Sequence, residues 1–101
     1  MSENSQTIQL PSNESAIALA GAKEQNLKLL SRHTGTQVIL RGQDLLIFGK
    51  EKAVDRCAKV VRSLKPLWSE SKGIFEPDIL TAFQAVDTGR TEEYSDLQSN
   101  I

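Results

Sequence analysis

Short runs with the composition of β-strands occur at three places in the chain. Thr7–Leu10 alternates polar and apolar residues, and Pro11 ends the run because proline has no amide proton to donate to a neighbouring strand. Gln37–Arg41 and Asp44–Phe48 are richer in apolar residues, and only Gly42 and Gln43 separate them. This spacing predicts a tight antiparallel hairpin.

Two helices are predicted between the first strand and the hairpin. The first has Ser12 as its N-cap and contains the apolar run Ile17-Ala18-Leu19-Ala20, which Gly21 interrupts. The second runs from about Lys23 to His33, and Gly35 closes it just past its end. Its apolar face is expected to consist of Leu27, Leu30 and Leu29.

The longest predicted element is a helix from Lys50 to about Trp68. Apolar residues recur along one face at three- and four-residue spacing, namely Val54, Cys57, Ala58, Val61, Leu64 and Trp68. Basic residues occupy the opposite face, at Lys52, Arg56 and Lys59. Pro66 lacks an amide proton and clashes with the preceding turn, so the helix is expected to end or kink near Lys65.

A further helix is predicted after the polar break at residues 69–73. It starts at Glu76-Pro77-Asp78, where proline suits the first turn and acids suit the helix dipole. Its apolar stripe is expected to contain Ile79, Leu80, Phe83 and Val86. Residues 87–100 are polar and acidic, which is typical of a linker.

Composition agrees with one ordinary soluble domain. The 101 residues are 39% hydrophobic and 25% charged, and no run of about 18 apolar residues could span a bilayer. The start of the chain lacks the basic and apolar regions of a signal peptide, so a cytoplasmic protein is expected. One cysteine and one histidine form neither an internal disulfide nor a cluster for a structural metal.

Charge is uneven along the chain, although the net charge is only −1. Residues 21–72 contain 11 Lys/Arg and 5 Asp/Glu, a balance of +6, whereas residues 73–101 contain one Arg and 6 acids, a balance of −5. A basic middle followed by an acidic end indicates either an anionic partner for the middle or screening of the middle by the end.

The predicted order of elements, β-α-α-β-β-α, resembles the type I K-homology (KH) fold. In KH domains a GxxG loop between two helices clamps the backbone of nucleic acid. Here the loop position is Gly21-Ala22-Lys23-Glu24, followed by Asn26-Leu27-Lys28-Leu29-Leu30 and later by Ile47-Phe48-Gly49. Glu24 departs from the pattern, because it places a side chain and a negative charge where the second glycine lets phosphate approach.

A fuller resemblance, over nearly the whole chain, is to the amino-terminal region of PhoH-like proteins. It rests on Gly21, residues 26–30, the stretch from Arg41 to Gly49, Ala53-Val54 and the helix that starts at Pro77. The resemblance implies an α+β, KH-like domain with a three-stranded sheet packed by helices, followed by an extra helix and an acidic tail. It also implies an ATPase domain, with bound ATP and Mg²⁺, beyond Ile101, and the family's name suggests a link to phosphate starvation.

The chain itself is not expected to be an enzyme. A phosphate-binding loop needs spaced glycines followed by Lys and Ser/Thr, and the nearest approach, Gly49-Lys50, is followed by Glu51. No catalytic, cofactor-binding or metal-binding residue is therefore assigned. The expected division is a KH-like domain at 1–72, an additional helix at 73–88 and a flexible linker at 89–101.

Several single residues have a structural as well as a functional interpretation. His33 is interpreted as part of a helix C-terminus rather than as a general base, and Cys57 as a small core residue rather than a reactive thiol. Trp68 is interpreted as core rather than as a base-stacking platform, and Tyr94 as a solvated residue. For the basic face at Lys52, Arg56 and Lys59, an anionic contact and an ordinary surface with an Asp55–Lys59 ion pair stay equally open.

Two functions follow from these interpretations. The first is binding of nucleic acid, with single-stranded RNA as the expected partner, through Gly21, Lys23, Lys28, Arg32 and Arg41. The alternative is a protein-interaction module that docks the protein's own ATPase domain or forms a homo-oligomer, through the sheet or the region of Trp68 and Phe83. No membrane partner is expected.

Overall fold

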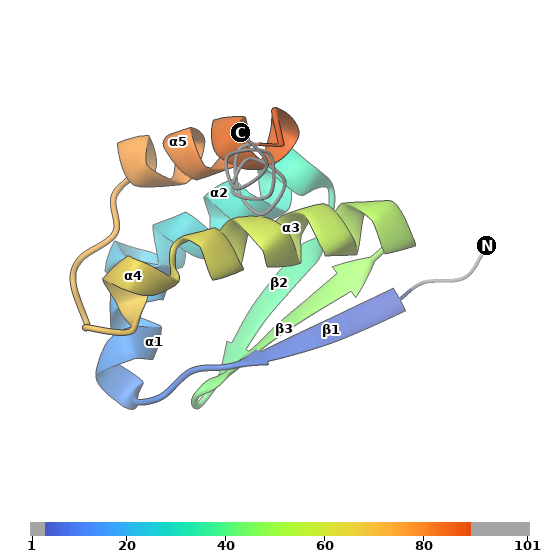
Figure 1. The fold of residues 1–101 in the computed structure, drawn as a ribbon. Helices are drawn as coiled ribbons and strands as arrows, with labels where there is room; N and C mark the ends of the chain where they lie inside the picture. Colours follow the sequence, from blue (N-terminus) through green and yellow to red (C-terminus); the bar gives the residue numbers. More distant parts are fainter. Residues whose placement is uncertain (1–3, 90–101) are drawn as a thin grey trace, which may run out of the picture.

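The computed structural model describes residues 4–89, which form a three-stranded sheet and helices packed together (Figure 1). The α+β, KH-like fold predicted from the sequence is confirmed. The elements in chain order are β1 (Asn4–Gln9), α1 (Asn13–Ala20), the 3-10 turn η1 (Ala22–Glu24), α2 (Gln25–Thr34), β2 (Gln37–Arg41), β3 (Asp44–Gly49), α3 (Glu51–Ser63), α4 (Lys65–Trp68) and α5 (Glu76–Asp87).

The sheet has the strand order β1-β3-β2, and both pairings are antiparallel. The hairpin prediction is confirmed, because Arg41 pairs with Asp44 across the two-residue turn. The predicted first strand at Thr7–Leu10 was too short at its start and one residue too long at its end, since β1 runs from Asn4 to Gln9. Its early residues pair with β3 through the backbone, which requires no apolar side chains.

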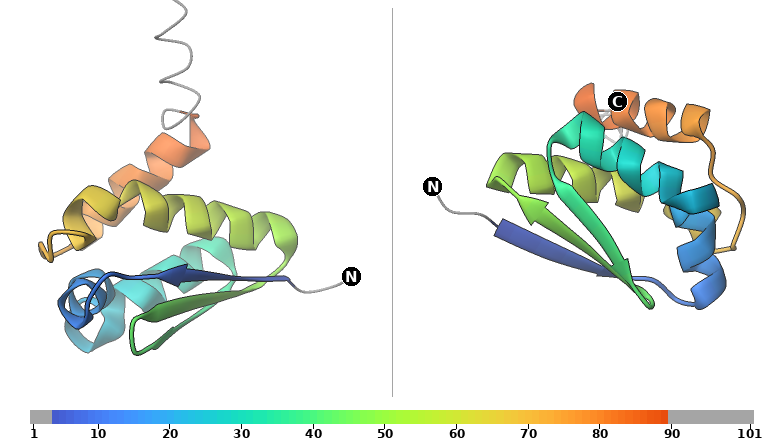
Figure 2. Two further views of the ribbon diagram at one scale, coloured as in Figure 1. Left: turned by 60° about the horizontal axis from the view of Figure 1, so that its bottom comes forward. Right: turned by 180° about the vertical axis from the view of Figure 1, so that it is seen from behind.

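One hydrophobic core lies between the sheet and the helices. Ile8, Leu45 and Ile47 point into it from the sheet, because side chains alternate between the two faces of a strand. Helix α3 packs on β1 and β3, and helix α2 packs on β2; Figure 2 shows their arrangement from two sides. The other face of the sheet carries Leu46 and Phe48, which are only half-buried.

The helix boundaries follow local backbone chemistry. The Oγ atom of Ser12 accepts a hydrogen bond from the N–H of Ser15 at 3.1 Å, which confirms the predicted N-cap of α1. Gly35 ends α2 with a left-handed φ of 71°, also as predicted. The long predicted helix divides at Leu64 into α3 and α4, one residue before the break expected from Pro66.

Helix α5 begins at Glu76, where the N–H of Phe75 donates to Oδ2 of Asp78 at 3.0 Å. Ile79 and Phe83 are buried against α2 and α3, but the prediction that Leu80 belongs to the apolar stripe was wrong. Leu80 is 41% exposed. Successive residues are rotated by about 100° around a helix, so the turn that buries Ile79 leaves its neighbour Leu80 exposed. Ala82 is buried on the core side of the helix instead.

The expected domain boundaries after residues 72 and 88 stay predictions, and the predicted linker lies almost wholly outside the described residues. Helix α5 adds Ile79 and Phe83 to the same core as the sheet. Within residues 4–89, no helix has the length and apolar character needed to cross a bilayer. Nor does this part of the chain group three or more metal-binding side chains.

Candidate nucleic-acid interface

The loop between α1 and α2 has a left-handed backbone at three of its four residues. Gly21 has φ 77°, Lys23 has φ 51° and Glu24 has φ 58°. Side chains with a β-carbon rarely adopt such angles, so Lys23 and Glu24 hold a conformation that glycine would adopt without strain. Glu24, at the position of the second glycine in the GxxG pattern, therefore has a backbone angle that glycine would adopt more easily.

Asn26 fixes this loop from inside the core. Its Nδ2 donates hydrogen bonds to the carbonyl of Leu19 at 3.0 Å and to the carbonyl of Ile74 at 2.7 Å. Asn26, Leu19 and Ile74 are all buried, and a buried polar group costs free energy unless it is hydrogen-bonded, so these two bonds stabilise the loop. Asn26 thus ties the end of α1 and the segment before α5 to the first turn of α2.

A groove of about 300 Å³ runs between α2 and β2, beside the loop. Leu27 and Val38 give it an apolar floor, whereas Lys28 and Arg32 stand along its α2 side. Glu24 lies at the same groove and adds a negative charge. Because α2 begins at this loop, the positive end of its dipole also faces the groove entrance, which favours an anion there.

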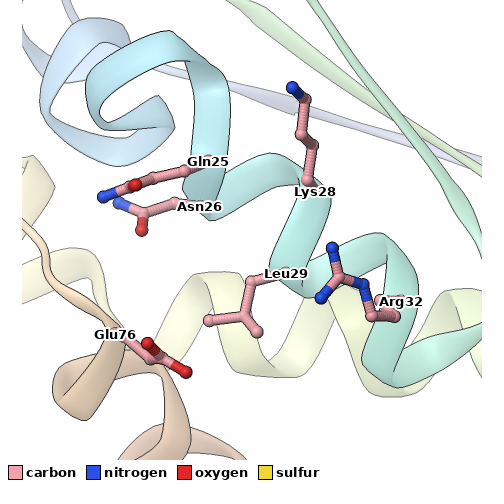
Figure 3. A pocket seen from close by; sticks show the side chains of 6 residues that line it. All are labelled: Gln25, Asn26, Lys28, Leu29, Arg32 and Glu76. Carbon is pink, nitrogen blue, oxygen red and sulfur yellow. The ribbon is translucent and has the colours of Figure 1, made fainter.

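A second, smaller groove of about 220 Å³ lies on the other side of α2, where α5 begins (Figure 3). It is lined by Gln25, Asn26, Lys28, Leu29, Arg32 and Glu76. Lys28 and Arg32 therefore border both grooves, and they form a cationic ridge along α2. We call Lys28 and Arg32 the α2 ridge.

The structure brings together only part of the predicted set of site residues. Gly21 and Lys23 lie in the loop, and Lys28 and Arg32 form the α2 ridge. Arg41 lines neither groove, because it ends β2 at the hairpin turn, where it pairs in register with Asp44. These residues stay candidates for binding.

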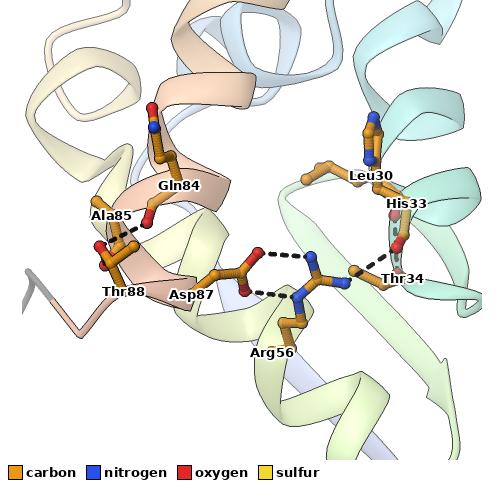
Figure 4. A network of polar contacts seen from close by, with 8 residues as sticks. All are labelled: Leu30, His33, Thr34, Arg56, Gln84, Ala85, Asp87 and Thr88. Atoms are coloured by element: carbon orange, nitrogen blue, oxygen red, sulfur yellow. Dashed lines mark hydrogen bonds and ion pairs between the residues drawn. The ribbon is translucent and has the colours of Figure 1, made fainter.

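Arg56 is not part of a free basic face, which corrects one of the two interpretations of the long helix. Its guanidinium makes two 2.8 Å hydrogen bonds to the carboxylate of Asp87 and a third of 3.0 Å to the carbonyl of His33 (Figure 4). Its Cζ also lies 4.9 Å from the centroid of the Phe83 ring. Arg56 therefore joins the C-terminal ends of α2 and α5.

The contact between Arg56 and Asp87 shifts the pKa of both groups. The hydrogen bonds and the positive charge of Arg56 lower the pKa of Asp87, and the carboxylate in turn raises the pKa of Arg56. On the same helix, Nζ of Lys59 lies 3.3 Å from Oδ2 of Asp55, which confirms the predicted ion pair. Of the predicted basic face on α3, two of the three cations already have an acidic partner.

The core interpretations of Cys57 and Trp68 are confirmed. Cys57 is fully buried, and this burial raises the pKa of its thiol, so the thiolate is disfavoured. Trp68 is buried and its indole N–H donates to the carbonyl of Val61 at 2.8 Å. His33 places its ring 5.0 Å from that of Phe83, while Tyr94 lies outside the described residues.

Sequence reasoning missed the role of Asn26. Its position within the run Asn26-Leu27-Lys28-Leu29-Leu30 was noted only as part of a family pattern. No local pattern marks Asn26 as buried, because one of its two hydrogen-bond partners, the carbonyl of Ile74, is 48 residues away in the sequence.

Comparison with known proteins agrees with this fold. The chain is 52% identical to a PhoH-like protein from Synechocystis sp. over all of its 101 residues, which confirms the predicted resemblance. It spans about a third (31%) of the length of that relative. Among solved structures, Dim2p from Pyrococcus horikoshii matches 81% of this chain and 48% of its own with a TM-score of 0.63, at 13% identity. No family model matches the chain.

Proposed function

We propose that this chain is a KH-like accessory module of a PhoH-like protein and binds single-stranded nucleic acid, with RNA as its partner. The observation that carries the proposal is the α2/β2 groove, which has an apolar floor, a glycine-type loop at one end and the α2 ridge along one side. ATP and Mg²⁺ would bind in the rest of such a protein.

The chemistry of the groove fits a sugar-phosphate strand. Lys28 and Arg32 are one helical turn apart, so they can contact successive phosphates, and phosphate contacts from Lys and Arg supply most of the sequence-independent affinity. Bases that point inward would lie on the apolar floor at Leu27 and Val38. Single strands fit this geometry because their bases are free to turn toward the protein.

Glu24 sets the strength of the interaction. The negative carboxylate of Glu24 offsets part of the positive potential of the groove and repels the negative phosphates of the ligand. The proposed binding is therefore weak and strongly salt-dependent. Short strands are expected to bind at low ionic strength and to dissociate as salt rises.

The test is fluorescence anisotropy of a labelled single-stranded RNA, titrated at low and at moderate salt. The Lys28→Glu/Arg32→Glu variant should lose binding. A Lys52→Glu/Lys65→Glu variant makes the same change in net charge away from both grooves and should keep most of it. Equal loss in the two variants would show a non-specific charge effect, and no binding at low salt would refute the proposal. Single-stranded DNA of the same sequence tests the preference for RNA.

A second candidate function is protein interaction through the open face of the sheet. Ile39, Leu46 and Phe48 lie on this face in adjacent register positions of β2 and β3, and all three are only half-buried. Such a stripe suits the surface of another domain of a PhoH-like protein or of a second copy of this chain. Sedimentation of the wild type and of Phe48→Ser would test this function by measuring self-association. The substitution should abolish self-association without changing binding of RNA.

A further inference from the structure

Strand β1 has an open outer edge. Within residues 4–89 its one neighbouring strand is β3, and the pairs from Asn4↔Gly49 to Gln9↔Asp44 follow one another without a bulge. The strand, Asn-Ser-Gln-Thr-Ile-Gln, contains no charged residue and no proline. Proteins usually protect an edge with lysine, proline or a bulge, because its unpaired N–H and C=O groups can bind another strand. Strand β1 has none of these three features.

The backbone groups of Ser5, Thr7 and Gln9 point away from β3. Leu10, which continues the register of β1, donates its N–H to the carbonyl of Gln43 at 2.8 Å. In an antiparallel pair, positions that exchange hydrogen bonds alternate with positions that do not. Counted back from Leu10, the even-numbered residues of β1 bond to β3. A further strand at this edge would therefore bond to Ser5, Thr7 and Gln9.

A second copy of β1 fits this edge about a two-fold axis. If Thr7 lies opposite Thr7 of the second copy, then Ser5 lies opposite Gln9, and all three outward residues of each strand are bonded. A shift by two residues leaves one of them opposite a residue beyond the strand. The register centred on Thr7 therefore makes the most hydrogen bonds, and paired threonines are favourable neighbours across two strands.

Helix α3 follows the same edge and has unevenly placed charges. Glu51 and Asp55 line a groove of about 500 Å³ between α3 and the start of β1. Lys59 is one turn beyond Asp55, and Nη2 of Arg62 donates to Oε1 of Gln6 at 3.1 Å. We call Glu51, Asp55, Lys59 and Arg62 the α3 edge face. Its first half is acidic and its second half is basic.

The same two-fold axis makes the α3 edge face complementary to itself. Helix α3 runs in the same direction as β1 and begins beside Asn4 (Figure 1). The midpoint between Glu51 and Arg62 is about 8 Å along the helix, and Thr7 is about 10 Å along the strand. An axis through Thr7 therefore places Glu51 opposite Arg62 of the second copy.

The spacing of the two helices is also suitable. Helix α3 packs on both β1 and β3, and neighbouring strands are about 4.8 Å apart, so the two α3 helices would be about 10 Å apart. Packed helices ordinarily lie about 8 to 10 Å apart. Side chains of the two edge faces can therefore meet.

The other edge of the sheet does not suit a second copy. Strand β2 borders the groove that the α2 ridge lines, and Arg41 stands at its end. A two-fold pairing of β2 would bring the cations of both copies together, and like charges repel. The charges therefore favour β1 over β2.

We propose that two copies of this chain pair through β1, so that their three-stranded sheets form one six-stranded antiparallel sheet with the two α3 helices side by side. The α2/β2 groove of each copy lies at the far edge of its sheet and stays open, so dimerisation does not depend on nucleic-acid binding. One strand and one helix face make a small interface, and the dimer is therefore weak and concentration-dependent.

Sedimentation of the whole chain tests the dimer, over concentrations from about 10 μM to about 1 mM. The wild type should change from monomer to dimer in this range. Thr7→Pro should stay monomeric with a near-native thermal midpoint, because the N–H that proline removes points away from β3. A wild type that stays monomeric throughout would overturn the proposal.

Cross-linking tests the register without depending on the proline variant. Directly bonded pairs have Cα atoms about 5.5 Å apart, a separation that a disulfide spans. Thr7→Cys should therefore cross-link to itself under mild oxidation, and Cys57 takes no part because it is buried. Ser5→Cys and Gln9→Cys should each stay uncross-linked alone but form a disulfide when mixed. Self-linkage of Ser5→Cys as efficient as that of Thr7→Cys would refute this register.

Charge reversal tests the α3 edge face. Glu51→Lys and Arg62→Glu should each weaken dimerisation about tenfold at low salt, because two like-charged pairs replace two opposite pairs. The double variant should recover most of the loss. Glu76→Lys is the matched control, since Glu76 is also in the first turn of its helix, and it should change dimerisation less than about twofold. Single reversals without effect would contradict the two-fold arrangement.

The edge dimer is distinguishable from the other two functions. Phe48→Ser changes the open face of the sheet and should leave the edge dimer intact; association lost in Phe48→Ser but kept in Thr7→Pro would overturn the proposal. The affinity of each chain for a short RNA should be the same in the wild type and Thr7→Pro. A failure of RNA binding therefore leaves the tests of the dimer unaffected.

Discussion

A β-carbon on Gly21 would lie 2.7 Å from Nδ2 of Asn26, which is closer than real β-carbons approach other atoms. The same Nδ2 holds the carbonyls of Leu19 and Ile74. The glycine at the start of the loop is thus required by the amide that fixes the loop as well as by its own backbone angles.

Gly21→Ala is therefore expected to destabilise the fold by about 2 to 4 kcal/mol. Gly21 has φ 77° and ψ −179°, a region that is almost restricted to glycine and costs other residues about 1 to 3 kcal/mol. Displacement of the Asn26 amide adds the loss of buried hydrogen bonds. Urea denaturation of both proteins measures the difference.

Gly35→Ala is the matched control, because Gly35 has φ 71° and no atom within 4 Å of a β-carbon. It should cost only about 1 kcal/mol, for the left-handed backbone alone. Equal costs at the two glycines would show that the contact with Asn26 is unimportant.

Asn26→Ala should destabilise the protein by about 2 to 4 kcal/mol, because it leaves two buried carbonyls without donors. Asn26→Asp should not rescue it, since an ionised carboxylate has no proton to donate. Hydrogen exchange at the first turn of α2 would report the local effect. Unchanged protection there in Asn26→Ala would contradict the assigned role.

Glu24→Gly should increase both stability and nucleic-acid affinity. Glycine relieves the left-handed strain at φ 58°, a gain of about 1 to 2 kcal/mol that its greater entropy in the unfolded chain reduces to about 1 kcal/mol or less. Loss of a carboxylate at the groove should tighten RNA binding several-fold at low salt.

Glu24→Gln separates the two effects, because it removes the charge but keeps the side chain. It should tighten binding without raising the thermal midpoint. An affinity that rises only in Glu24→Gly would mean that loop shape, and not charge, limits binding.

The contact between Arg56 and Asp87 should make stability depend on pH in the acid range. Arg56 lowers the pKa of Asp87, so the carboxylate contributes stability that is fully present above its unfolded pKa of about 3.9. This contribution is lost as pH falls through the lower pKa of the folded state. The pair is half-exposed, so its contribution is about 1 kcal/mol or less.

Denaturation of wild type and Asp87→Asn across pH 2 to 7 checks this expectation. The two stabilities should differ by a constant amount above about pH 5 and converge as pH falls through the lowered pKa of Asp87 in the folded state. A difference that stays constant throughout would show that the ion pair contributes nothing.

The regular elements were predictable because each leaves a local pattern. The two-residue Gly42-Gln43 separation gave the hairpin, and the spacing of Val54, Cys57 and Val61 gave the buried face of α3. The partner of Arg56 was not predictable, because Asp87 is 31 residues away and only the packing of α5 across α2 and α3 brings it near. The exposure of Leu80 was missed for the same reason.

The candidate site was predictable only as a set of residue types. Lys28 and Arg32 share one side of a helix by their spacing, so the ridge could be expected. That Arg41 lies away from it depends on where β2 ends relative to α2, which no local pattern fixes. The burial of Asn26 likewise depends on Ile74, a contact 48 residues away in sequence.

Trp68, the only tryptophan in the chain, makes the protein its own optical reporter. Its indole is 4% exposed and bonded to Val61, at the corner of α3 and α4, and it lines neither groove beside α2. Its emission maximum should therefore lie at short wavelength in the folded state and shift to longer wavelength on unfolding. The maximum should not change when a ligand fills those grooves. One unlabelled spectrum then distinguishes a variant that has lost its ligand from one that has lost its fold.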